Sequence, residues 1–459
     1  MLIRNAEIDF AWRADVRIED GIIVEMGSGL ASGRDAEIDA RGGALLPGLH
    51  DHHFHLLAFA AARDSVRCGP PFVADAETLA DALRSRASAS PGGWIRGIGY
   101  HESVAGEIDR DWLDRVLPMG PARIQHRSGR LWILNSRALE IVAGGNTPLE
   151  TVNGQLTGRL YDGDAWLRGR IGMVVPPIQD ASLYLASRGV IGITDTTPGN
   201  RLREFALLGE ARRAGDLLQN ILLMGGPGLD GLPPAEGVRV GARKFHLHET
   251  ALPDADELVA DIRQSHAAGR PAAFHCVTLG ELLFVLGALE EAGGIRGDRI
   301  EHAAVAPPDL LPWIARLGLT VVSQPNFIAE RGDAYLSDVD PADRPWLYRQ
   351  RGFREAGIRL AAGTDAPFGD ADPWVAMQAA VTRRTRAGAI IGAGEELTPE
   401  AALALFTGAP DDPGGPPRTI TVGAPADLCL LDRPWAEARR GLSEVAVTVT
   451  IVAGRVIWP

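Results

Sequence analysis

Four histidines and one aspartate fall within ten consecutive residues near the start of the chain, Pro47-Gly-Leu-His-Asp-His-His-Phe-His-Leu56. They directly follow an apolar, strand-like run that ends at Leu46. Side chains alternate between the two faces of a strand, so one face is expected to carry Asp51, His53 and His55 and the other face the remaining two histidines. Paired imidazoles at a strand end form half of a metal site, suited to zinc and also to iron, copper or nickel. The alternative is a polar surface loop of neutral histidines.

The elements that would position these residues can be read from the middle of the chain. Strand-like runs alternate with helical stretches there, which is the pattern of βα units around a parallel sheet. The opening strand is followed by seven further candidates, at residues 189–195, 218–224, 238–248, 272–276, 298–303, 319–325 and 358–365. Helices are predicted between them at 256–268, 279–292 and 309–317. This series of eight strands with intervening helices predicts a closed (β/α)8 barrel.

Residues able to ligate a metal stand at the ends of several of these strands. Functional groups of barrel enzymes gather at the C-terminal ends of the strands. The predicted strands carry at those ends His53, His55, Lys244, His275, His302 and Asp365. One histidine in such a place is usually structural, whereas this joint pattern favours a metal site. Lys244 shares a strand face with His246 and His248, so either histidine could replace it as a ligand.

Both ends of the chain consist of short alternating segments typical of antiparallel strands. Residues 1–46 and 417–459 are therefore predicted to combine into a small β-sandwich beside a barrel of residues 47–416. Roughly 130 residues separate the first two barrel strands, far more than a crossover needs. This predicts an inserted α/β subdomain at about 65–180, placed to form a lid or a substrate wall.

Composition and charge exclude several classes of protein. The net charge of −13 argues against a nucleic-acid binder and against attraction to anionic membranes. There is no run of uncharged apolar residues long enough to span a membrane and no visible signal peptide. The three widely spaced cysteines do not form a disulfide framework, so a cytoplasmic location is expected.

Several motifs together resemble the successive metal-site motifs of the amidohydrolase superfamily. They are residues 47–56, Lys244, Phe274-His275, Arg299-Ile-Glu-His302-Ala and Gly363-Thr-Asp365-Ala-Pro. The likeness is to the family 3 type, in the branch with N-substituted formamide deformylases and exoenzyme-regulator-like proteins, and it covers nearly the whole chain.

The resemblance implies a role for each of these residues. His53 and His55 would hold the more buried metal, and His275 and His302 would hold a second metal or contact substrate and water. Asp365 would ligate metal and act as general base. Lys244 matches a lysine that is carboxylated and bridges two ions in binuclear relatives. The alternative for Lys244 is an ion pair with Asp365 and a single metal.

The sequence departs from the family pattern in two places. Relatives often have Asp-Gly after the lysine, where this chain continues Phe245-His246. Relatives also tend to have a histidine where Arg130 stands, and an arginine there could favour an anionic substrate.

The predicted chemistry is hydrolysis by a metal-activated hydroxide. One or two divalent ions, most simply zinc, would acidify a bound water and polarise a carbonyl. Asp365 would take the proton and pass it to the departing nitrogen, while His302 or His275 would stabilise the oxyanion. The expected substrate is a small non-peptide amide, formamide or carbamate, and a homodimer is a candidate assembly. Alternatives are a metal-stabilised binding or regulatory protein on the same scaffold, or a lactone hydrolase or isomerase.

Overall fold

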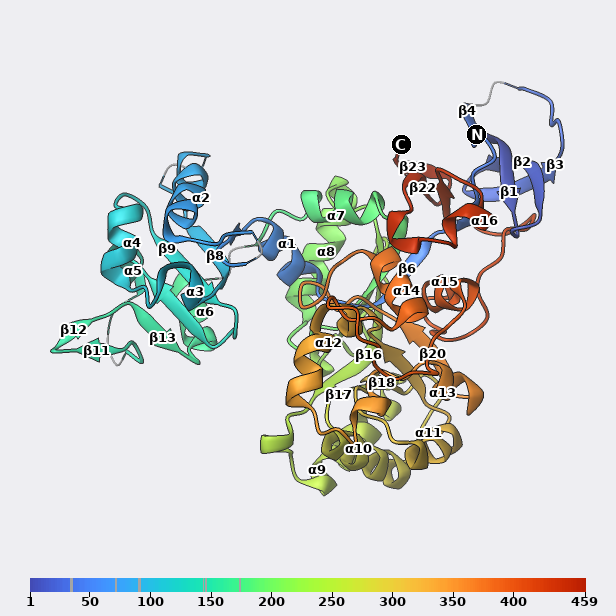
Figure 1. The fold of residues 1–459 in the computed structure, drawn as a ribbon. Helices are drawn as coiled ribbons and strands as arrows, with labels where there is room; N and C mark the ends of the chain where they lie inside the picture. The colour runs from blue at the N-terminus through green and yellow to red at the C-terminus, as the bar shows by residue number, and fades with distance from the viewer. Residues whose placement is uncertain (34–35, 71, 90–91, 143, 145–146, 173–174) are drawn as a thin grey trace. The chain divides into compact units, whose positions relative to one another are not determined.

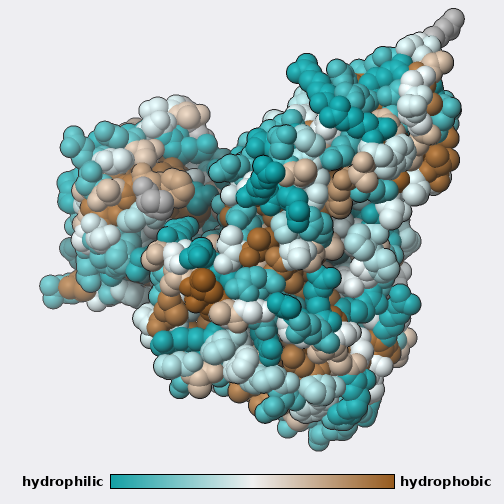
Figure 2. Space-filling view, turned by 45° about the vertical axis from the view of Figure 1, so that its right-hand side comes forward, coloured by the Kyte–Doolittle hydropathy of each residue, from teal (hydrophilic) through white to brown (hydrophobic). Residues whose placement is uncertain are grey.

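The computed structural model describes the chain except for residues 34–35, 71, 90–91, 143, 145–146 and 173–174. It divides into two compact units, which we call the barrel unit (residues 1–56 and 181–459) and the insertion unit (residues 57–180). Figure 1 follows the chain through both units, with each end of the chain in the barrel unit. Most of the surface seen in Figure 2 is hydrophilic, with hydrophobic side chains in scattered patches. No helix within the described ranges is both long and apolar enough to cross a membrane.

An eight-stranded parallel sheet forms the centre of the barrel unit. Its hydrogen-bonded order is β20-β19-β18-β17-β16-β15-β14-β6. The strands are β6 (Leu49–Phe54), β14 (Val190–Asp195), β15 (Asn220–Gly225), β16 (Val238–His246), β17 (Ala272–Cys276), β18 (Arg299–His302), β19 (Thr320–Ser323) and β20 (Arg359–Ala362). Every residue of β6, β14, β18 and β19 is buried, as expected for a parallel sheet covered on both faces. The predicted barrel is confirmed.

Hydrogen bonds between the ends of β6 and β20 close the barrel. Thr364 donates its backbone N–H and its hydroxyl to the Asp51 carboxylate, over 3.1 and 2.6 Å. The N–H of Asp365 donates to the carbonyl of His53 over 2.8 Å. Gly363 is required by space, since a Cβ there would lie 2.3 Å from the His53 backbone nitrogen. This seam sets His53 and Asp365 side by side.

Helices alternate with the barrel strands. They are α7 (Gln179–Ala186), α8 (Leu202–Ala214), α9 (Ala255–Ala267), α10 (Leu279–Ala292), α11 (Leu311–Arg316), α12 (Asn326–Asp338), α13 (Arg351–Glu355), α14 (Pro373–Thr382) and α15 (Pro399–Thr407). The helix predicted at 279–292 begins at a capping box, in which Thr278 and Glu281 satisfy each other's backbone N–H groups. The helix predicted at 309–317 begins instead with a 3-10 turn, Pro308–Leu310.

The two ends of the chain form two four-stranded sheets with a shared core. One sheet has the order β3-β2-β1-β4, built from β1 (Leu2–Ile8), β2 (Trp12–Glu19), β3 (Ile22–Gly27) and β4 (Glu37–Asp39). The other has the order β23-β22-β21-β5, built from β5 (Leu45–Pro47), β21 (Leu428–Leu431), β22 (Val447–Val452) and β23 (Arg455–Trp458), with the short helix α16 (Trp435–Ala438) nearby in the sequence. Ile3 and Val16 of the first sheet join Leu428 and Ile451 of the second in one buried cluster. The predicted sandwich of both chain ends is confirmed, and its boundaries at residues 46 and 417 stay a prediction.

The insertion unit is an α/β structure with its own core. Its five-stranded sheet has the order β13-β10-β9-β8-β7, and β11 pairs with β12. The strands are β7 (Val66–Arg67), β8 (Ile95–Tyr100), β9 (Ala122–His126), β10 (Leu131–Leu134), β11 (Thr151–Val152), β12 (Gln155–Leu156) and β13 (Arg159–Tyr161). The helices are α1 (Leu56–Arg63), α2 (Ala76–Ala89), α3 (Glu102–Ala105), α4 (Arg110–Val116), α5 (Ser136–Val142) and α6 (Asp164–Ile171). The predicted insertion is confirmed as a fold, and its role as a lid stays a prediction.

Candidate metal centre

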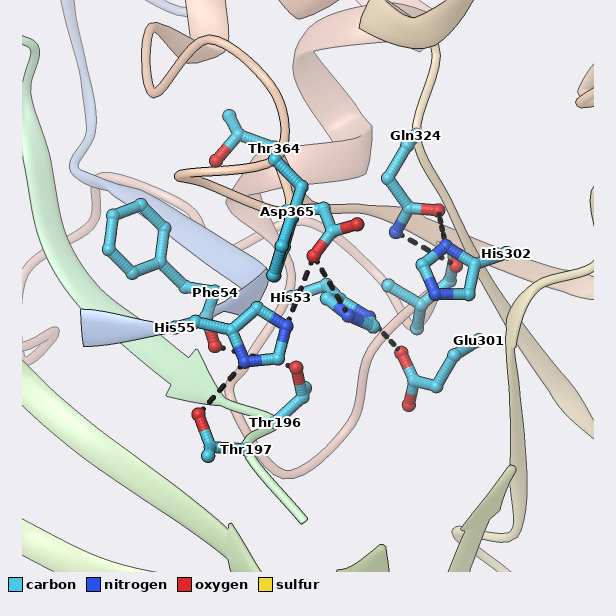
Figure 3. Close-up of polar contacts among 12 residues, drawn as sticks. His53, Phe54, His55, Thr196, Thr197, Glu301, His302, Gln324, Thr364 and Asp365 are labelled. Carbon is cyan, nitrogen blue, oxygen red and sulfur yellow. Dashed lines mark hydrogen bonds and ion pairs between the residues drawn. The ribbon is translucent and has the colours of Figure 1, made fainter. Parts of the chain in front are cut away.

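Two histidines and one carboxylate converge at the end of β6. His55 Nε2 lies 3.1 Å from Asp365 Oδ1, and His53 Nε2 lies 3.4 Å from the same oxygen (Figure 3). One ligand atom from each of the three residues falls within 4.8 Å of the others. His53 and Asp365 are buried and His55 is half-buried. The group therefore has the residue types and the spacing of a transition-metal site.

Hydrogen bonds on the far side of the rings direct their Nε2 atoms to the site. The Nδ1 atoms contact Glu301 Oε2 (2.5 Å, from His53), Thr197 Oγ1 (2.8 Å, from His55) and Gln324 Oε1 (2.6 Å, from His302), as Figure 3 shows. A carboxylate and an amide oxygen only accept hydrogen bonds, so Nδ1 carries the proton in His53 and His302. Their Nε2 atoms are left with a free lone pair, which is the form that binds a metal.

The protonation states at the site also suit metal binding. Burial lowers the pKa of His53, and it lowers that of His302 to about 3, so both rings are neutral at neutral pH. Burial would raise the pKa of Asp365, but positive charge beside the carboxylate, on His53 first, lowers it below its ordinary value. Where the rings are neutral, a bound cation would supply that charge. Neutral imidazoles and an ionised carboxylate are the forms in which these residues act as ligands.

Two polar atoms at the site are buried without a hydrogen bond. They are Nζ of Lys244, a residue that is 6% exposed, and Oδ1 of Asp365. Burial lowers the pKa of Lys244. Among the described residues, the two side chains form no ion pair with each other, so the alternative of a Lys244–Asp365 pair is not seen. A buried polar atom without a partner is costly. A cation at Asp365 Oδ1 would remove that cost, and the residues present therefore fit a divalent metal.

His302 and His275 lie beside the three-residue group. The ring of His302 is centred 4.7 Å from that of His53 and 4.6 Å from that of His275. His275 in turn stacks on His246 at 4.4 Å. Burial lowers the pKa of His275 and lowers that of His246 to about 4. A row of four imidazoles thus extends from β6 to β16.

Lys244 and its two neighbouring histidines differ in burial. His246 is the last residue of β16 and is exposed, and His248 follows the strand and is exposed as well. Lys244 is the buried member of the three. Arg130 lies in the insertion unit, where its guanidinium already makes two hydrogen bonds to the Asp162 carboxylate, of 2.7 and 2.6 Å.

Comparison with known proteins agrees with this geometry. Residues 36–458 match the sequence model of the amidohydrolase family. The chain belongs to this family. It is thus a metal-dependent amidohydrolase, as the resemblance of its motifs predicts.

Individual relatives span nearly the whole of this amidohydrolase. An N-substituted formamide deformylase from Arthrobacter pascens is 26% identical over 499 aligned residues, covering 92% of this chain and 90% of that protein. The crystal structure of an uncharacterized metal-dependent hydrolase from Pyrococcus furiosus has a TM-score of 0.76 at 22% identity, covering 94% of this chain and 98% of that one. A second such hydrolase, from Pyrococcus horikoshii, has a TM-score of 0.74 at 20% identity, with 94% and 97% covered. These two structures share the fold.

Proposed function

We propose that this amidohydrolase cleaves a C–N bond of a small non-peptide amide, formamide or carbamate. The observation that carries the proposal is the group of His53, His55 and Asp365, in which the Nε2 atoms of the two rings lie 3.4 and 3.1 Å from one buried carboxylate oxygen. The relative from Arthrobacter pascens, named a deformylase of N-substituted formamides, supports a C–N bond as the target.

His53, His55 and Asp365 would hold one divalent ion, and zinc suits two imidazoles and a carboxylate. Lys244, His275 and His302 are the candidates for holding a second ion, with Lys244 carboxylated. When bound, the metal supplies an acidified water and a polarised substrate carbonyl.

Asp365 is the candidate general base. It is ionised and buried at the site, so its carboxylate can accept the proton of the attacking water and return it to the leaving nitrogen. An amine is a poor leaving group without that proton, which is why one carboxylate that moves a proton in both directions fits C–N cleavage.

The histidines on β17 and β18 differ in what they can do. Gln324 Nε2 donates to the Val322 carbonyl, which leaves its Oε1 to accept from His302 Nδ1. His302 Nε2 then carries no proton and cannot donate to an oxyanion, so we assign His302 to ligation. His275, half-buried beside it, remains the candidate oxyanion donor.

The site is tested by the double substitution His53→Ala, His55→Ala. Metal content should fall, and hydrolysis of N-formyl and N-acyl amines in a substrate screen should vanish. The pair His101→Ala, His126→Ala is the matched control, because both histidines lie in the insertion unit and outside this group. An unchanged metal-to-protein ratio in the first variant would refute the site.

Asp365→Asn separates an enzyme from a binding or regulatory protein on the same scaffold. Loss of a general base typically lowers turnover by about 10²–10⁴-fold. Unchanged turnover in the metal-loaded variant would refute the catalytic role of Asp365.

A further inference from the structure

Glu301 is a fully buried carboxylate that the proposed reaction does not use. It is 0% exposed and lies one residue before His302 on β18. It accepts from His53 Nδ1 over 2.5 Å and from Arg299 Nε and Nη2 over 2.6 and 2.9 Å. Arg299 Nη2 also donates to the His52 carbonyl over 2.7 Å, which ties the pair to the backbone of β6.

Burying a charge in this position is unfavourable. Removing an ion pair from water is offset only when the geometry satisfies both charges. Both oxygens of Glu301 accept hydrogen bonds, Oε1 from Arg299 and Oε2 from Arg299 and His53. The guanidinium of Arg299 is always protonated, and its two hydrogen bonds to the carboxylate form an ion pair that favours the ionised form of Glu301.

His53 differs from the other two site histidines in its partner at Nδ1. A neutral hydroxyl oxygen faces Nδ1 of His55, and a neutral amide oxygen faces Nδ1 of His302. His53 is the one of these three whose Nδ1 faces a carboxylate. A hydrogen bond to an ionised acceptor is stronger and places more electron density on the ring.

We propose that Glu301, held by Arg299, is a positioning residue for His53. It fixes the Nδ1–H tautomer and the orientation of the ring, and it makes Nε2 of His53 a stronger metal ligand than it would be beside a neutral acceptor. The inference rests on the proposed function in one respect, the use of His53 as a metal ligand.

The backbone at the end of β18 allows both Glu301 and His302 to reach His53. Consecutive strand residues normally point to opposite faces, so Glu301 and His302 should not both reach His53. His302 has a φ of 69°, in the left-handed region, which ends the regular alternation. Its ring then lies 4.7 Å from that of His53, while the Glu301 carboxylate contacts Nδ1 of the same ring.

Glu301→Gln tests the proposal, with Glu395→Gln as the matched control. Glu395 is a second buried carboxylate, 2.8 Å from Arg349 Nε and bonded to the backbone N–H groups of Gln350 and Gly352. Both variants weaken a buried Arg–Glu pair, and only the first touches His53. The measurements are zinc affinity by competition with a chelator, the visible spectrum of the cobalt-substituted protein, and urea unfolding of the metal-free protein.

We expect Glu301→Gln to weaken zinc binding about 10–100-fold and to change the cobalt spectrum. Glu395→Gln should lose stability and keep wild-type zinc affinity. Wild-type affinity in Glu301→Gln, or an equal loss in both variants, would overturn the proposal. If Glu301→Gln does not fold, Glu301→Asp decides, because it keeps the charge but shortens the reach to His53 and should also weaken zinc binding.

His53→Ala distinguishes this inference from the proposed function. If His53→Ala binds zinc as the wild type does, the metal site itself is wrong. If His53→Ala loses zinc and Glu301→Gln does not, the site stands and the positioning role fails.

Discussion

Replacing Gly363 by alanine should separate the barrel seam without altering any ligand candidate. The φ of Gly363 is not positive, so the requirement for glycine there is one of space. A Cβ would lie 2.3, 2.4 and 2.7 Å from the backbone nitrogen, Cβ and Cα of His53. Those contacts must open by about 1 Å to reach an ordinary van der Waals separation. The clash is mainly with backbone, so no side-chain rotation relieves it.

Two measurements would detect the effect of this substitution, the free energy of unfolding and the zinc affinity. Overpacking a core lowers the free energy of unfolding by about 1–3 kcal/mol, which urea unfolding would detect. Metal ligands tolerate deviations of only about 0.2 Å, so a seam opened by several times that amount should reduce zinc affinity at least about tenfold. His53 and Asp365 would both be present and misplaced.

Gly287→Ala is the control for this experiment. Gly287 lies in α10, is exposed, and has open space around the position that a Cβ would take, with no atom of a neighbouring segment within 4 Å. Alanine there should stabilise the protein, by up to about 1 kcal/mol, because it favours the helix over the unfolded chain. The change from glycine to alanine is thus expected to lower the free energy of unfolding at Gly363 and to raise it at Gly287. Wild-type stability and zinc affinity in Gly363→Ala would refute the role assigned to the seam.

Two further predictions concern groups outside the metal site. Burial raises the pKa of Cys68 to about 12 and also raises those of Cys276 and Cys429, so a thiol reagent at pH 8 should label none of the three cysteines before unfolding and all of them afterwards. Labelling of the native protein would contradict this burial. Although burial opposes it, backbone N–H donors and Arg349 lower the pKa of Glu395. The stabilisation of the folded protein by ionised Glu395 is therefore complete above the ordinary pKa of about 4.5, and it is lost as the pH falls through the lowered pKa. The stability difference between wild type and Glu395→Gln, from urea unfolding at several pH values, should shrink on acidification, and a difference that grows would be contrary to this reasoning.

The sequence predicted the positions of the ligand candidates because a closed parallel barrel brings all strand ends to one rim. His53 follows from the strand pattern of residues 49–54, and His275 and His302 follow from later strands in the same way. The alternation predicted for the first strand is also seen, since the rings of His50 and His52 form one pair, 4.6 Å between centres, and those of His53 and His55 form another. Strand periodicity is a local property, and local patterns can be read from a single sequence.

The partners that orient the ligand candidates could not be predicted in this way. Glu301 is 248 residues from His53, and Thr197 is 142 residues from His55, so each contact depends on the register of strands that are distant in sequence. The sequence did contain one signal of such a partner. Arg299 and Glu301 place two opposite charges at period two in a strand of four buried residues, and buried charges are rarely unpaired.

The direction in which two site side chains point, as distinct from their position along the strands, depends on irregular backbone at two strand ends. His302 and Asp365 have φ values of 69° and 56°, where residues other than glycine are uncommon. Each such residue costs on the order of 1–3 kcal/mol and persists only where its surroundings hold it. Gln324 holds the ring of His302, and the hydrogen bond from the Asp365 N–H to the His53 carbonyl holds the end of β20. Regular strands therefore bring the ligand candidates to the rim. Left-handed residues at the ends of two segments, His302 with Ala303 on one and Asp365 on the other, then turn a side chain toward His53 that the alternation of a strand would direct elsewhere.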